Sequence, residues 1–319
     1  MYRGRFAPSP TGDLHLGSAA AALFCAAAAR ARGGRLVLRM EDLDRDRVIP
    51  AARTAILDDL RWLGVAWEEG PDVGGPASPY VQSERVALYA EAIELLASRG
   101  HVYLCDCSRA EIARAASAPH AGEEGPRYPG TCRPHGMRER AFRRPPAVRL
   151  AVPEGGEGSA LVEDAVLGRL VENVAETTGD FVLRRGDGVF AYQLAVVVDD
   201  LTMGVTEVVR GADLAASAPR QALLARLLGG APPAFAHIPL LLGPDGARLA
   251  KRARGMTLRD QRAAGRDGRE LARAVARAYR HDLGGAPDPV DALASCLSFA
   301  SLRGLAVMAG EDLTRASAG

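Results

Sequence analysis

The amino-acid sequence predicts an α/β fold. Short apolar segments of strand length alternate along the chain with longer segments in which apolar residues recur at helical spacing. The chain also opens with a strand, a Pro/Gly loop and an alanine-rich helix, an order of elements typical of such folds. Its 319 residues suffice to bury a large core and predict two or three structural units.

The first part of the chain shows these elements in order. The alanine-rich segment 19–29 follows the opening loop and is expected to be a buried helix, not the core of a signal peptide. A strand is expected at 36–40, and helical spacing of apolar residues covers 51–63 and 84–98. Gly100 follows the last of these helices, at a position where glycine readily ends a helix.

The middle of the chain is less regular. A strand is expected at 102–105, and Ser108 and Glu111 have the spacing of a capping box at the start of a short helix. Glycine, proline, glutamate and arginine dominate residues 119–158, which are expected to form an irregular insertion.

Regular elements return in the second half. Segments 181–185 and 189–194 flank a Gly-Asp-Gly turn and predict a β-hairpin. Strands at 205–210 and 237–242 enclose a helix near 220–228. The remainder is helical and ends in a tail of alanine, glycine and serine. No internal repeat is present, and no GxGxxG follows a strand, so a dinucleotide-dependent oxidoreductase has little support.

The opening loop enters its helix in a way typical of phosphate-binding corners. The segment RFAPSPTGDLHLGS, from Arg5 to Ser18, places His15 and Gly17 at the start of the helix. A helix N-terminus offers unpaired N–H groups and the positive end of its dipole, and glycine lets the backbone come close to a ligand. An ordinary Pro/Gly turn is the alternative, but it does not account for the histidine.

A single lysine is the second local signal. The chain holds 40 Lys and Arg residues, of which only Lys251 is lysine. It lies in RLAKR, residues 248–252, just after a GPDG turn. Under such a bias toward arginine, a lysine indicates a place for a compact ammonium group that a planar guanidinium cannot replace. A surviving surface lysine is the alternative.

The formal net charge of +1 hides an uneven distribution of charge. Residues 248–282 carry eleven Lys and Arg against four Asp and Glu. This strip is either a contact for a polyanion or a solvated helix face, and the sequence leaves both open. No stretch approaches the roughly 18 apolar residues of a membrane span, so no membrane partner is expected.

The cysteine spacing indicates a metal site. Cys105 and Cys107 lie two apart at an expected strand end, so both thiols point to one side. Cys132 follows, with Tyr128 four residues before it. Three thiolates and one further donor would complete the tetrahedral shell of a structural zinc. Plain buried thiols are the alternative.

The fourth donor and the remaining cysteines are less defined. A Tyr128 phenolate would be an unusual ligand, and its substitutes nearby are His101, His120 and His135. Cys25 and Cys296 lie elsewhere and are expected to be packing residues. Five cysteines in a chain of intracellular character argue for thiols or a metal, not for disulfides.

Both local motifs resemble signatures of class I aminoacyl-tRNA synthetases. RFAPSPTGDLHLGS resembles their HIGH signature in its glutamate/glutamine form, with Ser18 in place of the usual second histidine. RLAKR resembles their mobile KMSKS loop, with Lys251 on the second lysine. The departures in this loop are Arg248, Ala250 and Arg252.

The resemblance covers roughly residues 1–255. It implies a Rossmann-type parallel-sheet catalytic core with a zinc-binding insertion and a short helical C-terminal region. The implied units are 1–100 for the first half of the catalytic domain, 101–160 for the insertion, 161–245 for the second half, and 246–319 for the lysine loop and a helical region without a full anticodon-binding domain.

The resemblance also implies a glutamate pocket. Its positions in this sequence are Arg5, Phe6, Ala7, Pro8, Ser9, Glu41, Tyr192 and Arg210. Arg5 and Arg210 would clamp the two carboxylates, and Glu41 would accept from the α-ammonium group. Tyr192 and Ser9 would fix the orientation through hydrogen bonds.

The implied reaction consumes ATP. The glutamate carboxylate attacks the α-phosphorus of ATP and gives glutamyl-adenylate and pyrophosphate. His15, Gly17 and Lys251 would be the catalytic and ATP-binding residues, because they place donors and a cation where negative charge grows on the phosphates. Mg²⁺ would arrive with ATP, since it binds mainly through phosphate oxygens and water.

The cysteine pattern makes the resemblance specific to one group of these synthetases. Cys-x-Cys…Tyr-x-x-x-Cys resembles the zinc site of the glutamyl-queuosine synthetases, short relatives of glutamyl-tRNA synthetases. The implied ligands of one structural zinc are Cys105, Cys107, Tyr128 and Cys132. Only 64 residues follow Gly255, too few for the anticodon-binding region of a full glutamyl-tRNA synthetase. The implied acceptor of glutamate is therefore the queuosine base at the wobble position of tRNA(Asp).

Two alternatives stay open. One is a short glutamyl-tRNA synthetase that charges the 3′ end of tRNA(Glu), against which the missing anticodon-binding region argues. The other is a non-catalytic paralogue that binds RNA or glutamate as a regulator. Four retained positions argue against it: His15, Glu41, Arg210 and Lys251. A monomer located in the cytoplasm is expected.

Overall fold

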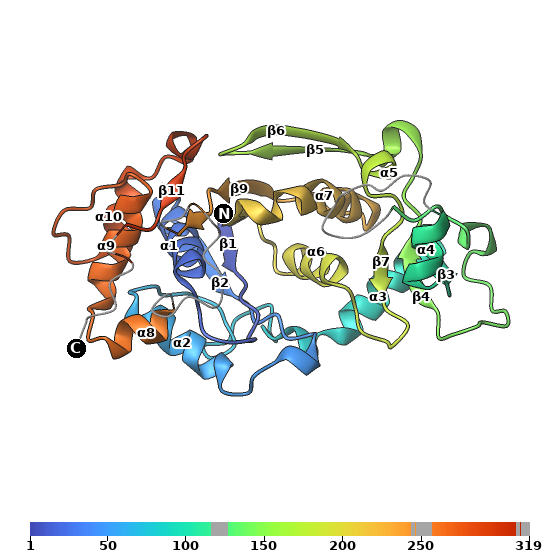
Figure 1. The fold of residues 1–319 in the computed structure, drawn as a ribbon, viewed down its shortest axis with the longest axis horizontal. Helices are drawn as coiled ribbons and strands as arrows, with labels where there is room; N and C mark the ends of the chain where they lie inside the picture. Colours follow the sequence, from blue (N-terminus) through green and yellow to red (C-terminus); the bar gives the residue numbers. More distant parts are fainter. Residues whose placement is uncertain (116–126, 244–245, 247–256, 311–312, 314–319) are drawn as a thin grey trace.

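The structure of the protein, a computed structural model, describes residues 1–115, 127–243, 246, 257–310 and 313. Figure 1 shows three parts along the longest axis of the molecule. The C-terminal helices lie at one end, the main sheet and its helices in the middle, and a small antiparallel sheet at the other end.

The main sheet has six strands, and the parallel-sheet α/β fold predicted from the sequence is confirmed. In spatial order they are β2 (Arg35–Leu38), β1 (Arg3–Phe6), β8 (Glu207–Gly211), β9 (Ala234–Ile238), β5 (Ser159–Asp164) and β6 (Gly168–Asn173). All neighbours are parallel except β5 and β6, which form an antiparallel hairpin. The carboxyl ends of the five parallel strands therefore meet at one edge of the sheet.

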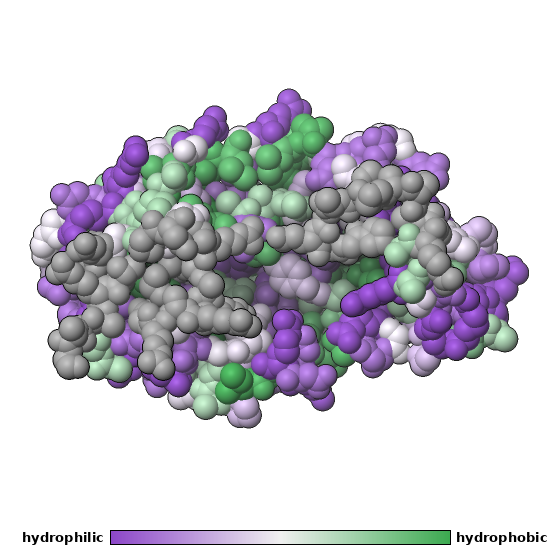
Figure 2. Space-filling view, viewed as in Figure 1, coloured by the Kyte–Doolittle hydropathy of each residue, from purple (hydrophilic) through white to green (hydrophobic). Residues whose placement is uncertain are grey.

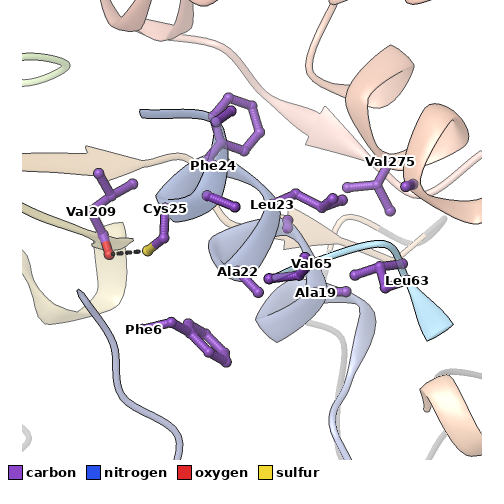
Figure 3. Packing of buried hydrophobic residues seen from close by; sticks show 14 of the residues in the cluster. Phe6, Ala19, Ala22, Leu23, Phe24, Cys25, Leu63, Val65, Val209 and Val275 are labelled. Atoms are coloured by element: carbon purple, nitrogen blue, oxygen red, sulfur yellow. Dashed lines mark hydrogen bonds between the residues drawn. The ribbon is translucent and has the colours of Figure 1, made fainter. Parts of the chain in front are cut away.

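Helix α1 (Leu16–Ala31) is the buried alanine-rich helix that the sequence predicts. It packs on β1 and β8 and also contacts the C-terminal helices α9 (Gly268–Ala278) and α10 (Pro289–Cys296). Its small side chains allow this close packing on several sides, as Figure 3 shows around Ala19, Ala22 and Cys25. The Cys25 thiol lies 3.2 Å from the carbonyl oxygen of Val209 and is a packing residue, as expected.

Five other helices agree with the sequence pattern: α2 (Ala52–Trp62), α3 (Val86–Ser98), α4 (Arg109–Ala115), α7 (Ala218–Leu227) and α8 (Leu258–Ala263). The sequence did not predict the helices α5 (Val174–Thr177) and α6 (Tyr192–Thr202). The expected capping box begins α4, where the Ser108 N–H donates to the Glu111 carboxylate at 2.6 Å and the Glu111 N–H donates back to Ser108 at 3.2 Å. The expected helical C-terminal region is confirmed, since α9 and α10 begin at the capping residues Asp267 and Asp288.

The small sheet places one regular strand, β4 (Ala147–Leu150), within the segment 119–158 that the sequence predicts to be irregular. Its strands β3 (Val102–Cys105), β4 and β7 (Val182–Arg184) are antiparallel, with β4 in the centre. The sequence does not reveal β4, because its four residues are too few to show an alternating pattern and prolines precede them. They form a strand because β3 and β7 pair with them on either side and satisfy their backbone hydrogen bonds.

The predicted hairpin at 181–194 is confirmed next to its turn but not at its far end. Arg184 and Phe190 form an antiparallel bridge, and the N–H groups of Arg185 and Ala191 donate to the Val189 and Leu183 carbonyls, both at 2.8 Å. The chain then enters α6 at Tyr192, where the sequence predicts a strand. The last three residues of the predicted strand, 192–194, belong instead to this helix, in which residues 193–200 are all buried between other elements. A helix satisfies the backbone groups of such a buried segment by itself.

Two further strands differ from expectation. The segment 237–242 is divided, because β9 ends at Ile238 and β10 (Leu241–Leu242) pairs instead with β11 (Val307–Met308). The β5–β6 hairpin was not predicted. Figure 2 shows apolar side chains where this hairpin lies, and Leu161 and Val171, paired across it, are exposed. Within the described part of the chain, no helix is both long enough and apolar enough to cross a membrane.

Candidate active site and cysteine cluster

A cavity of about 780 Å³ opens beside the carboxyl ends of β1 and β8 and the start of α1. The predicted pocket and corner residues among its lining are Arg5, Phe6, Ala7, Pro8, Ser9, His15, Gly17, Glu41, Tyr192 and Arg210. They come from four distant segments of the chain. This edge of a parallel sheet is where α/β folds usually bind ligands.

The loop between β1 and α1 is held in place by backbone hydrogen bonds. The N–H of Glu41 donates to the Pro8 carbonyl at 3.0 Å, which ties this loop to the segment after β2. His15 is the N-cap of α1, and a Cβ atom added at Gly17 would meet no atom within 4 Å. The first turn of α1 therefore faces open space, where its N–H groups can receive an anion.

Two buried guanidinium groups line the cavity. Arg210 Nε donates to His237 Nε2 at 3.0 Å, and Arg210 Nη2 donates to the Leu214 carbonyl at 3.2 Å. Among the described residues, Arg210 Nη1 has no hydrogen-bond partner although it is buried. Arg5 lies 3.4 Å from the Asp200 carboxylate. A buried cation with an unused donor is a binding position for a carboxylate or phosphate.

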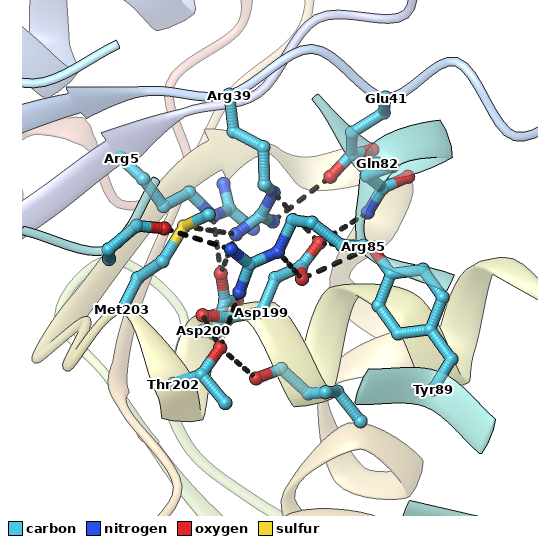
Figure 4. Close-up of polar contacts among 12 residues, drawn as sticks. Arg5, Arg39, Glu41, Gln82, Arg85, Tyr89, Asp199, Asp200, Thr202 and Met203 are labelled. Carbon is cyan, nitrogen blue, oxygen red and sulfur yellow. Dashed lines mark hydrogen bonds and ion pairs between the residues drawn. The ribbon is translucent and has the colours of Figure 1, made fainter. Parts of the chain in front are cut away.

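Glu41 belongs to a charge cluster that the sequence did not predict. Figure 4 shows Arg39, fully buried, in the centre of three carboxylates. Its guanidinium donates to Asp200 at 2.7 Å and to Glu41 at 3.0 Å, and its Nε lies 3.5 Å from Asp199. The available signal was the adjacent Asp199 and Asp200 at the end of an apolar run, since buried acids need a cation.

This cluster orients Glu41 toward the cavity. Burial raises the pKa of the Glu41 carboxyl, and the neighbouring Arg39 and Arg5 act in the opposite direction. Burial alone would lower the pKa of Arg39, but Asp200, Asp199 and Glu41 together raise it above its usual value. A positively charged ligand group beside Glu41 would further favour the ionised carboxylate.

Lys251 lies outside the described residues, as do Arg248, Ala250 and Arg252. The structure describes the chain again from Thr257. Thr257 pairs with His15 in an antiparallel bridge, and the N–H of Leu258 donates to the Leu14 carbonyl at 2.8 Å. Arg259 and Asp13 form an ion pair at 2.8 Å. Residues 257–259 are thus attached to the start of α1 and the loop before it.

The described part of the basic strip has its own partners. Arg269 and Arg273 donate to the Pro287 and Ala286 carbonyls, both at 2.9 Å. These two arginines therefore stabilise the connection between α9 and α10, which accords with the solvated-face alternative for this portion.

The three predicted cysteine ligands lie together. The sulfur atoms of Cys105, Cys107 and Cys132 are within 4.8 Å of one another, and Cys107 and Cys132 are 3.6 Å apart. Tyr128 Oη lies 3.4 Å from the Cys105 sulfur and 3.5 Å from that of Cys107. Thiolates around a tetrahedral zinc, with Zn–S about 2.3 Å, lie about 3.8 Å apart, so the four groups fit this metal.

The other predicted metal donors are not part of this group. His101 lines a separate pocket, and His120 lies outside the described residues. Within the described chain, no histidine belongs to the cysteine cluster. The expectation that Cys296 is a packing residue is wrong, since its side chain is exposed at the end of α10.

Comparison with known proteins identifies the family. Residues 1–279 match the model described as "tRNA synthetases class I (E and Q), catalytic domain". The chain belongs to this synthetase family. The HLGS corner, the parallel sheet and the cavity at its edge are thus parts of a class I synthetase catalytic domain, and the protein is a class I aminoacyl-tRNA synthetase-like ligase. Synthetases of this class use ATP with Mg²⁺.

Similar curated proteins carry two names. The chain is 52% identical over 269 residues to the glutamyl-Q tRNA(Asp) synthetase of Nitratidesulfovibrio vulgaris, an alignment that covers 83% of this chain and 82% of that protein. The protein of the same name from Symbiobacterium thermophilum is 52% identical over 274 residues, with the same coverage. Glutamate–tRNA ligase 1 of Halorhodospira halophila is 46% identical over 252 residues, covering 78% of this chain and 52% of that protein.

The synthetase fold is also present in solved structures. A glutamate tRNA ligase from Elizabethkingia meningosepticum, crystallised in complex with its amino acid, superimposes with a TM-score of 0.78 at 26% identity. This match covers 98% of the chain and 68% of that protein. The glutamate–tRNA synthetase of Elizabethkingia anophelis superimposes with a TM-score of 0.79 at 25% identity, and the match covers 98% of this chain and 69% of that protein.

Proposed function

We propose that the protein activates L-glutamate with ATP and transfers the glutamyl group to the queuosine base at the wobble position of tRNA(Asp). The observation that carries this proposal is one cavity lined by two buried guanidinium groups, a carboxylate and a helix N-terminus. An amino acid with two carboxylates and one ammonium group matches these charges. The similarity to glutamyl-Q tRNA(Asp) synthetases supports the choice of acceptor.

The proposed roles follow from the positions of the side chains. Arg5 and Arg210 receive the carboxylates, Arg210 through Nη1, which has no partner among the described residues, while Glu41 accepts from the ammonium group. Tyr192, exposed at the cavity mouth, and Ser9 fix the orientation by hydrogen bonds. Phe6, Ala7 and Pro8 line the cavity wall.

The proposed reaction has two steps. A carboxylate oxygen of glutamate attacks the α-phosphorus of ATP, and the bond to the bridging oxygen of pyrophosphate breaks. A hydroxyl of the cyclopentene-diol then attacks the activated carbonyl, and AMP leaves. His15, Gly17 and the start of α1 hold the phosphates, and Lys251 neutralises their growing charge. Mg²⁺ accompanies ATP.

Without any tRNA, the protein is expected to exchange labelled pyrophosphate into ATP when glutamate is present. The reason is that the proposed amino-acid and ATP residues all lie in the catalytic domain. Glutamine should be a poor substrate, because its neutral amide leaves one arginine without an anion. Absence of glutamate-dependent exchange at high protein concentration would instead support the regulatory paralogue.

The acceptor is tested by offering the protein, glutamate and ATP to tRNA(Asp) with and without queuosine, and to tRNA(Glu). Only the queuosine-containing tRNA should be charged. Charging should persist after removal of the terminal 3′ adenosine, since the ester would form on the anticodon base. It should weaken as salt rises, because RNA binding releases counterions. Transfer to the 3′ end of tRNA(Glu) would establish the short-synthetase alternative.

We also propose that Cys105, Cys107, Tyr128 and Cys132 hold one structural zinc. Elemental analysis should find about one zinc per chain, as a closed four-ligand site requires. C107S should lose the metal and loosen the small sheet, whereas the matched variant C25S should keep it. A well-folded preparation without metal would contradict the assignment.

The division of the chain at residues 100, 160 and 245, the monomeric state and the cytoplasmic location remain predictions. The first rests on the resemblance to synthetases, and the cytoplasmic location rests on composition.

A further inference from the structure

A chain of three buried polar side chains crosses the main sheet behind the cavity. Arg210 on β8 and His237 on β9 are direct neighbours in the parallel ladder. Asp164, at the end of β5, pairs with Phe235, two residues before His237, so it lies on the same face. Its carboxylate is 2.5 Å from His237 Nδ1, and His237 Nε2 is 3.0 Å from Arg210 Nε.

We propose that His237, oriented by Asp164, is a positioning residue that holds the Arg210 guanidinium ready for the substrate carboxylate. This inference rests on the proposed function of the cavity. Neither His237 nor Asp164 lines the cavity, so both act through Arg210. Only Arg210 reaches it, with Nη1 free of other partners among the described residues.

The two partners of His237 determine its tautomer. Nδ1 faces a carboxylate and therefore carries the hydrogen, whereas Nε2 faces an N–H donor and must present its lone pair. The imidazole is thus neutral. Burial lowers the pKa of His237, and although the bond to Asp164 acts against this, the Arg210 charge lowers it further. A protonated imidazole would place two donors against each other.

The guanidinium is restrained on its other sides as well. Arg210 Nη2 donates to the Leu214 carbonyl, and its central carbon lies 5.2 Å from the centre of the Phe235 ring. The Phe235 and His237 rings stack with 4° between their planes. The direction of Nη1 is therefore set by fixed groups before any ligand binds, which lowers the ordering cost of binding.

Three variants test the role of His237. H237F keeps an aromatic ring on Phe235 but removes the acceptor for Arg210 Nε, and we expect kcat/KM for glutamate to fall roughly 10²-fold, mainly through KM. KM for ATP should change little. H237Q offers an amide oxygen near the position of Nε2 and should recover most of the loss. In D164N the amide oxygen should keep accepting from the Val166 and Leu167 N–H groups, so the NH2 group faces His237 Nδ1. This favours the tautomer with hydrogen on Nε2, and D164N should therefore resemble H237F.

A double variant of Asp164 and His237 distinguishes a positioning role from a general loss of stability. D164N/H237F should be no worse than H237F, since the two residues act on Arg210 through one path. H281F removes another buried histidine that does not line the cavity, and its KM for glutamate should stay normal. Melting temperatures of all variants are measured alongside. If H237F does not fold, the KM values of H237Q and D164N for glutamate are compared instead to test the role of His237.

The outcomes also distinguish this inference from the proposed function. If the wild-type protein shows no glutamate-dependent exchange, the proposed function fails. If the wild type is active and folded H237F and D164N retain a normal KM for glutamate, the positioning role is overturned. An equal loss in H237F and H237Q, with KM for ATP raised to the same extent, would likewise overturn it.

Discussion

Replacing Arg39 by methionine is expected to lower the free energy of unfolding by about 3–5 kcal/mol, the scale for removing one partner from a buried ion pair. Arg39 is fully buried and is shared by three carboxylates. Asp199 would keep its bonds to Arg85 and Tyr89, but Asp200 and Glu41 would each lose their short contact to a cation. Urea denaturation of both proteins measures the difference.

The loss should depend on pH. Burial would raise the pKa of Asp200, but Arg5 and Arg39 together hold it below its usual value. Because this folded-state pKa is depressed, the stabilisation is present above the unfolded value of about 3.9 and disappears as the pH falls through the folded one. The difference between wild type and R39M should therefore shrink in acid.

The matched control is R30M. Arg30 also pairs with an aspartate, at 2.7 Å from Asp291, but half of its side chain is exposed. Such a surface pair contributes about 0–1 kcal/mol. Equal effects of R39M and R30M would mean that the buried cluster is not what stabilises the segment after β2.

Replacing Lys251 by arginine is expected to reduce the rate of glutamate-dependent ATP–pyrophosphate exchange roughly 10²-fold or more, the scale for one preorganised transition-state contact. The substitution keeps the charge but replaces a compact ammonium group with a planar fork. Thr257, six residues later in the sequence, pairs with His15 at the start of α1. Initial-rate measurements at saturating ATP and glutamate provide the comparison.

The control R30K makes the opposite substitution, arginine to lysine, at an exposed site. It should leave the rate of ATP–pyrophosphate exchange unchanged. Near-normal exchange by K251R would show that the single lysine of this chain is an accident of composition.

Signals that lie close together in the sequence predicted the corner at the start of α1 and the cysteine pair, whereas the glutamate pocket came from resemblance. The HLGS corner, the capping box at Ser108 and the alanine-rich helix each depend on neighbouring residues. The Cys-x-Cys pair likewise limits both thiols to one side of a strand end. Resemblance supplied the more distant members, Glu41, Tyr192 and Arg210, which line one cavity with the corner.

Only the tertiary structure revealed the groups that hold these residues. Arg39 and Asp200 are 161 residues apart, and Asp164 and His237 are 73 apart, so no local pattern indicates that either pair meets. The same holds for β4 and α6, whose form depends on the partners that surround them. Local sequence determined where a turn, a cap or a helix begins, because those depend on adjacent backbone and side-chain groups. The ion pairs and strand pairings between distant residues depend on burial. A buried charge or strand is stable only with a partner, and the tertiary structure determines which residue that partner is.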